Sequence, residues 1–330
     1  MAAQRMKKLL IYGAAGYTGA MVAEQAKAAG LNVEIAGRDA AKLRILAERL
    51  DVPYRVLSLD EPLSRALEGV NVLLNCAGPF ALTAQPLMNA CIEAGVSYLD
   101  ITAEINVYRL AERLSVQAAK AGVMLLPGVG WDVVPTDCLA MHVAERVRSP
   151  QSLRVALQVA GSMSRGSAIS ASEIIGAGLM ARIDGRLVAT PDAQPQLFDF
   201  GNGPVLCAPL SFGDLITAWH STAIPNIAMY VHVTGNAFPT GDLAQLPDGP
   251  SAEQRLAQPA HAVAEVTGAD GTVARSVIGT VNGYSYTPLA AVEAARRVLG
   301  GEVRQGFATP AQVFGVGFAQ SIPGTWVTDR

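Results

Sequence analysis

A glycine-punctuated turn near the start of the chain constrains the fold most strongly. Leu9 to Tyr12 form the short apolar run of a buried strand, and Gly13, Gly16 and Gly19 follow at three-residue intervals into a helical pattern. In such a turn glycine lets the backbone approach a pyrophosphate, and the unpaired N–H groups at the helix start attract the anion. The G-x-x-G-x-x-G spacing is looser than G-x-G-x-x-G, so an ordinary tight turn stays open as an alternative. The cofactor contacts predicted here are Gly13, Ala15, Gly16, Tyr17, Thr18 and Gly19.

The end of the second expected strand indicates which dinucleotide binds. The run from Asn32 to Ala36 predicts this strand, and Gly37 and Arg38 follow it. In NAD-binding folds an acidic residue about 20 positions beyond the glycines accepts the ribose hydroxyl, whereas an arginine accommodates the 2′-phosphate of NADP. Arg38 stands where the acid is expected, so the sequence favours NADP(H), with Gly37 and Arg38 as contacts. Alternatively, Arg38 only solvates the helix that begins at Asp39.

Helix and strand patterns then alternate up to about residue 149. Helices are expected at 40–50, 62–67, 84–94, 103–121 and 138–148, and strands at 54–57, 70–75, 97–99 and 123–126. Continuous apolar runs are typical of parallel strands buried on both faces, so the predicted fold class is α/β with a doubly wound, Rossmann-type sheet. Ligands of such sheets bind beyond the carboxyl ends of the strands. The loop of Cys76, Ala77, Gly78 and Pro79 is therefore predicted to contact the cofactor. Alternatively, Gly78-Pro79 is only a turn-forming dipeptide in a loop.

Four side chains at strand ends and crossings are candidate catalytic residues: Tyr98, Asp100, Glu104 and Asp132. Glu104 has a structural alternative, because a carboxylate in the first turn of a helix is favoured by the helix dipole. Asp132 has no such explanation, since other residues can cap the helix that follows it. The chain lacks a Ser-Tyr-x-x-x-Lys arrangement, a Gly-x-Ser-x-Gly elbow and a His-Glu-x-x-His motif, which argues against short-chain dehydrogenase and hydrolase chemistry.

Strand patterns predominate beyond Pro150 and predict a second, α+β domain with a mixed or antiparallel sheet. Strands are expected at 153–160, 186–189, 215–217, 228–233 and 272–281, a helix at 162–181, and an insertion with a polar helix at 238–268. Arg165 could bind a substrate carboxylate in bidentate fashion, while the serines around it could equally cap the helix. His220 is expected on a strand, where either a structural or a catalytic role is open. The predicted substrate contacts are Arg165, Trp131 and His220.

Composition limits the partners and the compartment. A chain of 330 residues exceeds the usual size of one core, so two domains are expected. Charged residues make up 16% of the chain and hydrophobic residues 50%, which predicts extensive burial and favours a homodimer. The net charge of −3 argues against nucleic-acid and membrane partners. No signal peptide or membrane span is recognisable, so a cytoplasmic location is expected. The cysteines lack metal-ligand spacing, so no metal site is expected.

Several motifs taken together resemble a known family. They are GAAGYTG at 13–19, Ala36-Gly37-Arg38, NCAGPF at 75–80, YLDITAE at 98–104 and GWDVVPTD at 130–137. In this order they resemble the saccharopine dehydrogenase-like reductases, which include trans-acting enoyl reductases. The resemblance implies an NADPH-dependent oxidoreductase that reduces a C=N, C=O or activated C=C bond of a small molecule. Ala103 and Trp131 to Pro135 depart from the common family pattern, so the substrate stays open.

The same resemblance implies a discontinuous first domain. GFATPAQVFG at 306–315 and a helix at 289–299, capped by Thr287, resemble the segment that returns to the nucleotide domain in this family. The predicted domains are 1–149, completed by 284–330, and a substrate-binding and dimerisation domain at 150–283. A second class of function also fits the residues, namely a regulator that senses NADP(H) on the same framework without turnover.

Overall fold

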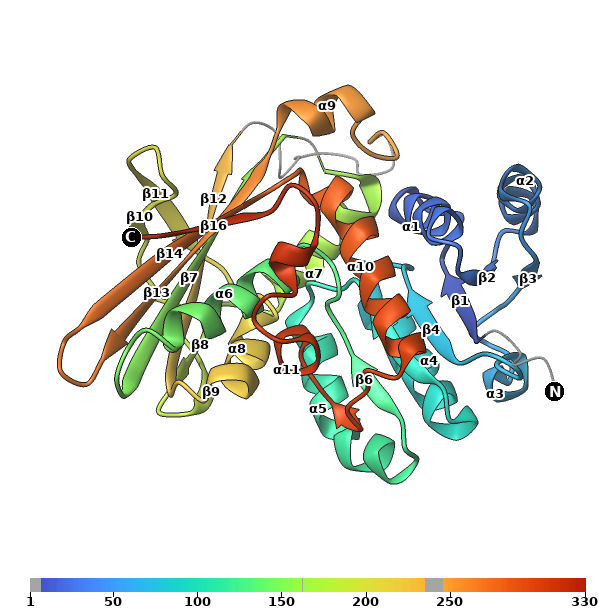
Figure 1. Cartoon of the computed structure of the whole chain (residues 1–330), viewed down its shortest axis with the longest axis horizontal. Coiled ribbons are helices and arrows are strands. Elements are labelled where there is room, and N and C mark those ends of the chain that lie inside the picture. Colours follow the sequence, from blue (N-terminus) through green and yellow to red (C-terminus); the bar gives the residue numbers. More distant parts are fainter. Residues whose placement is uncertain (1–6, 162, 235–245) are drawn as a thin grey trace.

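The first β-sheet carries the glycine turn (Figure 1). Within residues 7–161, 163–234 and 246–330, which this computed structural model describes, the sheet has seven strands in the order β15-β6-β5-β4-β1-β2-β3, all parallel. The strands are β1 (Lys8–Tyr12), β2 (Asn32–Gly37), β3 (Tyr54–Val56), β4 (Val72–Asn75), β5 (Ser97–Asp100), β6 (Met124–Leu126) and β15 (Gly306–Phe307). The strand order reverses between β1 and β4, as in dinucleotide-binding sheets.

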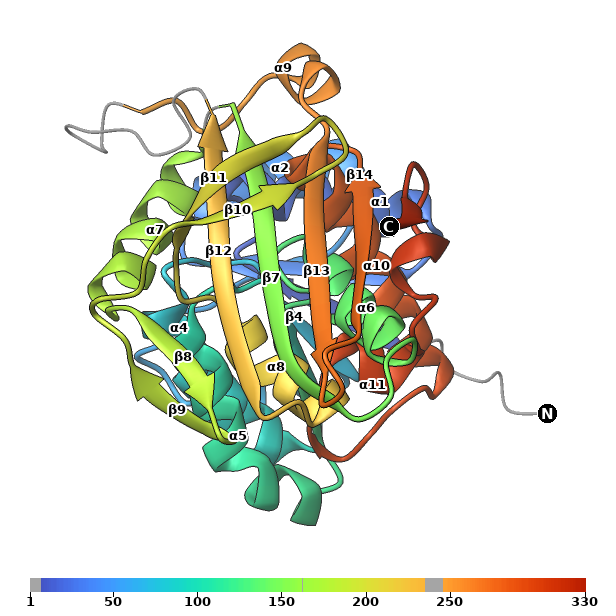
Figure 2. The same ribbon diagram turned by 90° about the vertical axis from the view of Figure 1, so that its left-hand side faces the viewer.

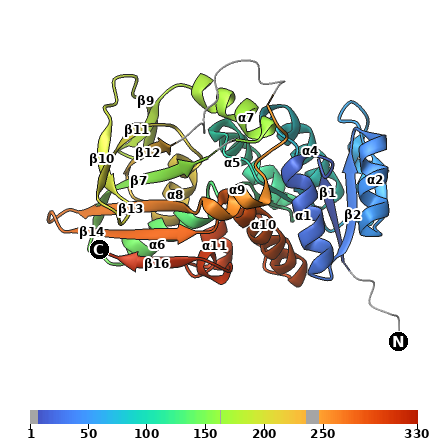
Figure 3. The same cartoon turned by 90° about the horizontal axis from the view of Figure 1, so that it is seen from above.

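Helices cover both faces of this sheet, which confirms the predicted doubly wound class (Figure 3). One face carries α1 (Tyr17–Ala28), α2 (Ala40–Leu50) and α10 (Gly283–Gly300), and the other carries α4 (Phe80–Ala94) and α5 (Ile105–Lys120), with α3 (Leu63–Ala66) packed on α4. Leu9, Leu10 and Ile11 of β1 are fully buried as a result. A strand covered on both sides gains from apolar residues at every position, and this explains the continuous apolar runs in the sequence.

The second sheet is mixed, as predicted. Its nine described strands follow the order β10-β11-β12-β7-β13-β14-β16, with β8 and β9 attached to β12. The β7–β12 pair is parallel and the other pairs are antiparallel. The strands are β7 (Pro150–Ala160), β8 (Met180–Ile183), β9 (Arg186–Ala189), β10 (Gln196–Asp199), β11 (Pro204–Pro209), β12 (Asn226–Thr234), β13 (Ala260–Gly268), β14 (Val273–Thr280) and β16 (Trp326–Asp329). The β10–β11 hairpin crosses the outer face (Figure 2).

Two helices fill the space between the sheets. α6 (Val134–Ala144) packs on β13 and β14, and α8 (Asp214–Thr222) packs on α5, α6 and β12. A single apolar core therefore extends from β1 through these helices to β7. The remaining helices are α7 (Arg165–Gly176), α9 (Ala252–Ala257) and α11 (Pro310–Phe314), with a short 3-10 turn at Ala319–Ser321.

The expected strand at 215–217 is wrong, because these residues belong to α8. His220 therefore lies on a helix rather than a strand. Leu215, Ile216 and Ala218 are buried against neighbouring helices, and a short apolar run of this kind has no periodicity that separates a helix from a strand. Tertiary packing decides the outcome.

The expected insertion at 238–268 is also partly wrong. Its polar helix is confirmed as α9, capped by Ser251, but residues 260–268 form β13, a central strand between β7 and β14. Residues 238–245 lie outside the described part of the chain. The helix expected at 162–181 ends at Gly176, because Gly178 takes a φ of 77° and β8 follows; Ser162 itself is not described.

Helix starts and the end of the chain differ from the expectation in detail. α10 begins at Gly283 with Asn282 as its cap, so Thr287 lies inside the helix. α6 begins at Val134, and Pro135 occupies its first turn, where its missing N–H costs nothing. β15 pairs with β6 as the resemblance implied, but β16 pairs with β14 and places 326–329 in the second sheet.

Among the described residues, no helix combines the length and the apolarity that crossing a bilayer requires. The cysteines Cys76, Cys91, Cys138 and Cys207 are buried and unpaired.

Candidate active site

The turn between β1 and α1 is shaped for close approach of a ligand. Gly13 has a φ of 80°, and a Cβ there would lie 2.7 Å from the backbone N of Ala77. A Cβ at Gly19 would lie 2.2 Å from the carbonyl O of Gly13. Gly16 is the N-cap of α1, and no side chain caps this helix. The first N–H groups of α1 are thus left for an anion in the cavity that the turn lines.

Two cations stand at the carboxyl end of β2. Arg38 is exposed and lines the same cavity, together with Gly37 and Lys42. The start of α2 is capped by Asp39, whose Oδ1 accepts from the backbone N of Lys42 at 3.0 Å. The cap does not require Arg38, so its guanidinium stays available for a phosphate. Lys42 was not predicted from the sequence as a cofactor contact. Its position about one helical turn after Arg38 is the sequence feature that could have indicated it.

The loop after β4 is held by a buried amide. The side chain of Asn75 donates to Thr83 Oγ1 at 3.0 Å and to the Tyr98 hydroxyl at 3.2 Å, and its Oδ1 accepts from the backbone N of Ala77 at 2.9 Å. Among the predicted contacts in this loop, Cys76, Ala77 and Gly78 line the cavity. Pro79 is the N-cap of α4 and is not among the lining residues.

Tyr98 and Asp100 lie beneath the cavity rather than in its wall. Both are fully buried, and the Tyr98 hydroxyl donates to Asp100 Oδ2 at 2.8 Å. Asp100 Oδ1 accepts from the backbone N of Thr102 at 3.0 Å and of Gly128 at 2.9 Å. Burial raises the pKa of Asp100 to about 7, although these hydrogen bonds act in the opposite direction. The pair fixes the loops after β5 and β6, and neither residue reaches the cavity lining.

Glu104 ties two helices together. Its Oε1 accepts from the backbone N of Phe80 at 2.9 Å and its Oε2 from that of Ala81 at 2.7 Å, so it caps the start of α4. Ser170 of α7 also donates to Oε1, at 2.8 Å. Glu104 is buried and absent from the cavity lining. These contacts are structural, but they differ from the expected place in a first helical turn. Glu104 is the N-cap residue that precedes α5, and its carboxylate caps α4.

Asp132 is the one candidate acid that reaches the cavity. It follows the β6 crossing and keeps part of its surface open to the cavity. Burial alone raises the pKa of this carboxyl to about 6. Its neighbour Trp131 also lines the cavity and is held on both sides. The indole Nε1 donates to Thr280 Oγ1 at 2.9 Å, and the backbone N donates to Thr287 Oγ1 at 3.0 Å.

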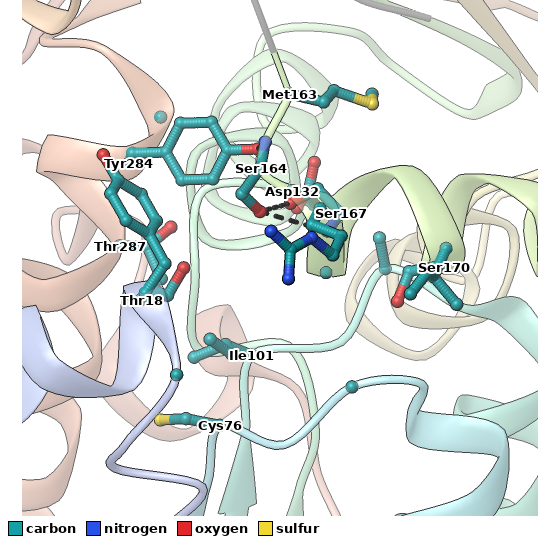
Figure 4. Close-up of a pocket in the computed structure, with 18 of the residues that line it drawn as sticks. Thr18, Cys76, Ile101, Asp132, Met163, Ser164, Ser167, Ser170, Tyr284 and Thr287 are labelled. Atoms are coloured by element: carbon teal, nitrogen blue, oxygen red, sulfur yellow. Dashed lines mark hydrogen bonds between the residues drawn. The ribbon is translucent and has the colours of Figure 1, made fainter. Parts of the chain in front are cut away.

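The opposite wall comes from the start of α7 (Figure 4). Ser164 caps this helix by accepting from the backbone N of Ser167 at 3.1 Å, and its own backbone N donates to the Tyr284 hydroxyl at 2.8 Å. Arg165 donates through Nη2 to the carbonyl O of Leu246 at 2.8 Å and lies 3.3 Å from Asp248 Oδ1. The guanidinium is therefore already engaged. Tyr284 was missed by the sequence reading, because it comes from 120 residues further along the chain.

The segment 246–258 reaches across to the glycine turn. The Tyr17 hydroxyl donates to the carbonyl O of Pro250 at 2.5 Å and accepts from Arg255 Nη1 at 2.6 Å. The Tyr17 ring also meets the edge of Tyr284, with centroids 5.5 Å apart. Because Tyr17 opens α1, the predicted cofactor loop and this segment are directly linked.

These walls enclose one cavity of about 820 Å³. Its nucleotide half is lined by the turns after β1, β2 and β4, and its other half, here named the substrate half, by the residues around Asp132, α7 and the loop after β11. Figure 4 shows Thr18, Thr287, Cys76, Asp132 and Ser170 arranged around this common space. No group of three or more His, Cys, Asp or Glu side chains in the described chain is placed to hold a metal ion.

His220 is not brought to the cavity. Its Nε2 lies 2.6 Å from Glu112 Oε1 of α5, and its ring meets the edge of Phe307. The residue links α8 to α5 and β15 on a different side of the core.

A family model for the saccharopine dehydrogenase NADP-binding domain matches residues 9–126. This part of the chain is similar to the NADP-binding domain of saccharopine dehydrogenases. The match confirms the resemblance stated from the sequence motifs. NADP(H) is confirmed as the cofactor at the level of the matched family.

Curated relatives match over less than half of the chain. A lipid droplet localized protein of Caenorhabditis elegans is 32% identical over 145 residues, covering 39% of this chain and 34% of the relative. A trans-acting enoyl reductase of Mycobacterium ulcerans is 30% identical, with 44% and 37% covered. A human saccharopine dehydrogenase-like oxidoreductase is 29% identical, with 44% and 39% covered. The matched segment thus spans little more than a third of the length of these relatives.

The fold of the whole chain has a counterpart among solved structures. Saccharopine dehydrogenase (L-Glu forming) from Saccharomyces cerevisiae superimposes with a TM-score of 0.65 over 98% of this chain and 99% of the other, at 13% identity. The parallel sheet and the mixed sheet therefore occur together in a known architecture.

Proposed function

We propose that the protein is an NADPH-dependent oxidoreductase that transfers hydride to a C=N, C=O or activated C=C bond of a small molecule. The observation that supports this most is the single cavity in which the NADP-binding turn and the carboxyl group of Asp132 meet. A cofactor that carries hydride needs a protein that orients the substrate and moves a proton, and both halves of this cavity match those tasks. The names of the relatives are consistent with such chemistry.

The nucleotide half holds the groups that would bind the cofactor. The Gly13 turn and the start of α1 would receive the pyrophosphate, and Arg38 and Lys42 would bind the 2′-phosphate. The loop of Cys76 to Gly78 would lie over the dinucleotide. Bound NADPH supplies the hydride.

Asp132 would supply the proton. Its pKa of about 6 lies close to neutral pH, which suits a general acid. Tyr98, Asp100 and Glu104 stay predictions as catalytic residues, and their hydrogen bonds favour structural roles. Direct substrate contact by Trp131 and Arg165 is proposed from their place in the lining, whereas His220 has no such support.

The decisive experiment is to follow NADPH absorbance with a panel of aldehydes, ketones, imines and enoyl compounds. Arg38→Ala should weaken NADPH binding about 10- to 100-fold and NADH binding little, because only NADPH presents the 2′-phosphate. Equal losses for the two cofactors would sink the assignment of Arg38. NADPH binding without oxidation by any compound in the panel would count against an enzyme.

The second candidate is an NADP(H)-sensing regulator without turnover. The hydrogen bonds of Tyr17 to Pro250 and Arg255 favour it, because they offer a route by which an occupied turn could alter a distant segment. The same absorbance assay separates the two functions. A cytoplasmic location, the homodimer and the division of the chain at 149 and 283 are likewise proposals, and light scattering of the purified protein tests the dimer.

A further inference from the structure

We propose that the substrate half of the cavity accepts a neutral, largely apolar carbonyl or enoyl compound, and not an amino acid or another anion. This inference rests on the proposed function and names the substrate class of the same site. It follows from what the walls contain, which charges they carry, and which polar groups are already in use.

The walls of the substrate half are mainly hydrocarbon. Phe212, Ile174 and Trp131 are buried side chains that nonetheless border the cavity, and Leu210, Val159 and Ile101 extend the same surface. They come from five separate parts of the fold, so the apolar surface surrounds a ligand instead of touching one side of it. Such a surface gains free energy from covering hydrocarbon and none from covering a charged group.

The charged residues of the described lining are Arg38, Asp39, Lys42, Asp132, Arg165 and Asp248. The first three lie at the β2–α2 end, in the nucleotide half. Among the described residues that line the substrate half, the only cation is Arg165, and it already bonds the carbonyl O of Leu246 and faces Asp248. Residues 235–245 contain no Lys, Arg or His in their sequence. A carboxylate bound here would have to share an engaged guanidinium or be buried without a partner, which is costly.

The polar groups that remain in this half are neutral. Ser170 donates to Glu104 and Ser164 donates to Ser167, so these two hydroxyl protons are in use. The hydroxyls of Tyr284, Thr287 and Ser167 accept hydrogen bonds, which leaves their protons free to be donated. Neutral donors of this kind suit a carbonyl oxygen, whereas they do not offset the charge of a buried carboxylate.

Asp132 completes the argument for a neutral ligand. In the reduction of a ketone, the carbonyl carbon receives the hydride that NADPH supplies and the oxygen receives the Asp132 proton, giving a secondary alcohol, NADP⁺ and the Asp132 carboxylate, which regains its proton from water. A cationic ligand would hold Asp132 as a counter-ion in its ionised form and would meet Arg165 in the same half of the cavity. Burial raises the pKa of Asp132 to about 6, so a fraction of the carboxyl groups keeps the proton near neutral pH and can donate it.

The test measures equilibrium binding of four matched probes to the NADP⁺-saturated protein by saturation-transfer NMR. The probes are 2-octanone, 2-hexanone, the anion 7-oxooctanoate and the cation 2-aminooctane. We expect 2-octanone to bind at least tenfold more tightly than either ion. Each methylene group should add about fourfold in affinity, so 2-hexanone should bind more weakly than 2-octanone.

A pair of variants on α7 supplies the control. Ile169 is half-buried and lines the cavity, so Ile169→Arg places a new cation in the substrate half and should shift the preference at least tenfold towards 7-oxooctanoate. Ile175 lies on the same helix but is 60% exposed and outside the lining. Ile175→Arg should leave the preference unchanged.

Tighter binding of either ion than of 2-octanone would overturn the proposal, as would equal affinities for the two ketones or no binding of any probe up to its solubility. A parallel shift in both variants would also overturn it, because the effect would then be one of net charge. Failure of the proposed function is read separately, as loss of NADP⁺ binding or as absence of NADPH oxidation by every compound in the wider panel.

Discussion

Asp132, the proposed proton donor, is expected to lower the stability of the folded protein at neutral pH. Its pKa of about 6 lies above the ordinary value of 3.8, because burial disfavours the charged form. A carboxyl group whose pKa is raised by folding stabilises the folded protein while the group is protonated. This contribution to the free energy of unfolding is fully present below about pH 4, where the group is protonated in both states, and is lost as the pH rises through about 6. At neutral pH the protein therefore bears the cost of a buried carboxylate.

Asp132→Asn tests this expectation. We expect turnover to fall at least 100-fold with NADPH affinity nearly unchanged, because the amide cannot donate the proton. The melting temperature should rise at pH 8, by an amount that corresponds to about 1 kcal/mol, and should not rise at pH 4. Thermal melts at the two pH values with a turnover assay would check both. An unchanged rate would return Asp132 to a structural role.

Gly13 is the residue at which the cofactor turn has least room. Gly13→Ala adds a Cβ at a φ of 80° and within 2.8 Å of the N and Cα of Ala77. We expect a loss of about 1–3 kcal/mol in unfolding free energy without cofactor, together with weaker NADPH binding. Gly16→Ala is the matched control, because its Cβ would come no closer than 3.4 Å to the carbonyl O of Gly13. Urea unfolding of both variants decides the matter, and equal losses would contradict this reading.

At the scale of single residues, sequence motifs predicted the cavity residues that lie within one strand–turn–helix unit. They did not predict the residues that reach the cavity from elsewhere in the chain. The glycines and Arg38 belong to one strand–turn–helix unit, so spacing alone placed them at the cavity. Tyr98 and Asp100 also come at a strand end, but position along a strand does not tell whether a side chain points into the cleft or into the core. Tyr284 enters the site from a helix distant in sequence, and no local pattern marks it.

Among the elements, α4 depends on a carboxylate supplied by another segment. Glu104 caps α4 through the backbone N atoms of Phe80 and Ala81, and it reaches α7 through Ser170. The start of α4 borders the cofactor loop, so this cap positions the loop as well. The helix has no side-chain cap from its own N-cap residue, Pro79.

Glu104→Gln should destabilise the protein by about 1–3 kcal/mol, because one amide oxygen replaces two acceptors and a donor now faces a backbone N–H. Ser170→Ala removes only the link to α7 and should cost less than half as much. Denaturant unfolding measures both. If Glu104→Gln left stability intact but abolished turnover, a catalytic role for Glu104 would regain support.

Helices and strands were predicted more accurately from the sequence around the parallel sheet than around the mixed sheet. Strands of the parallel sheet are buried on both faces, so their apolar runs and the glycines between them predicted the order of elements up to β6. In the mixed sheet one face is partly open and the signal per strand is weak. The 260–268 strand was therefore read as part of an insertion, and a buried helix, α8, was read as a strand.

For the molecule as a whole, the segment 246–258 connects the two sheets at the cavity. It bonds Arg165 at one end, and Tyr17 meets it through Pro250 and Arg255. A ligand that orders the glycine turn should therefore also stabilise this segment.

Hydrogen exchange can detect that link. We expect NADPH to slow amide exchange at 250–258 at least fivefold in the native protein and much less in Tyr17→Phe, which lacks the hydroxyl. Tyr54→Phe, on the partly exposed β3, is the control and should behave as the native protein does. Equal protection in the native protein and in Tyr17→Phe would show that the hydroxyl does not carry the coupling.

The pairing of β15 with β6 sets the order in which a growing chain can complete its sheets. α10, which packs on α1, β1 and β4, and β15, which closes the parallel sheet, both follow β14 in the chain. As the chain leaves the ribosome, the buried face of β1 and β4 thus stays without its covering helix until most of the second sheet has been synthesised. Nascent chains with uncovered apolar strands associate readily. Early chaperone capture is therefore a consequence of this topology, and a fragment ending near residue 149 should aggregate instead of folding.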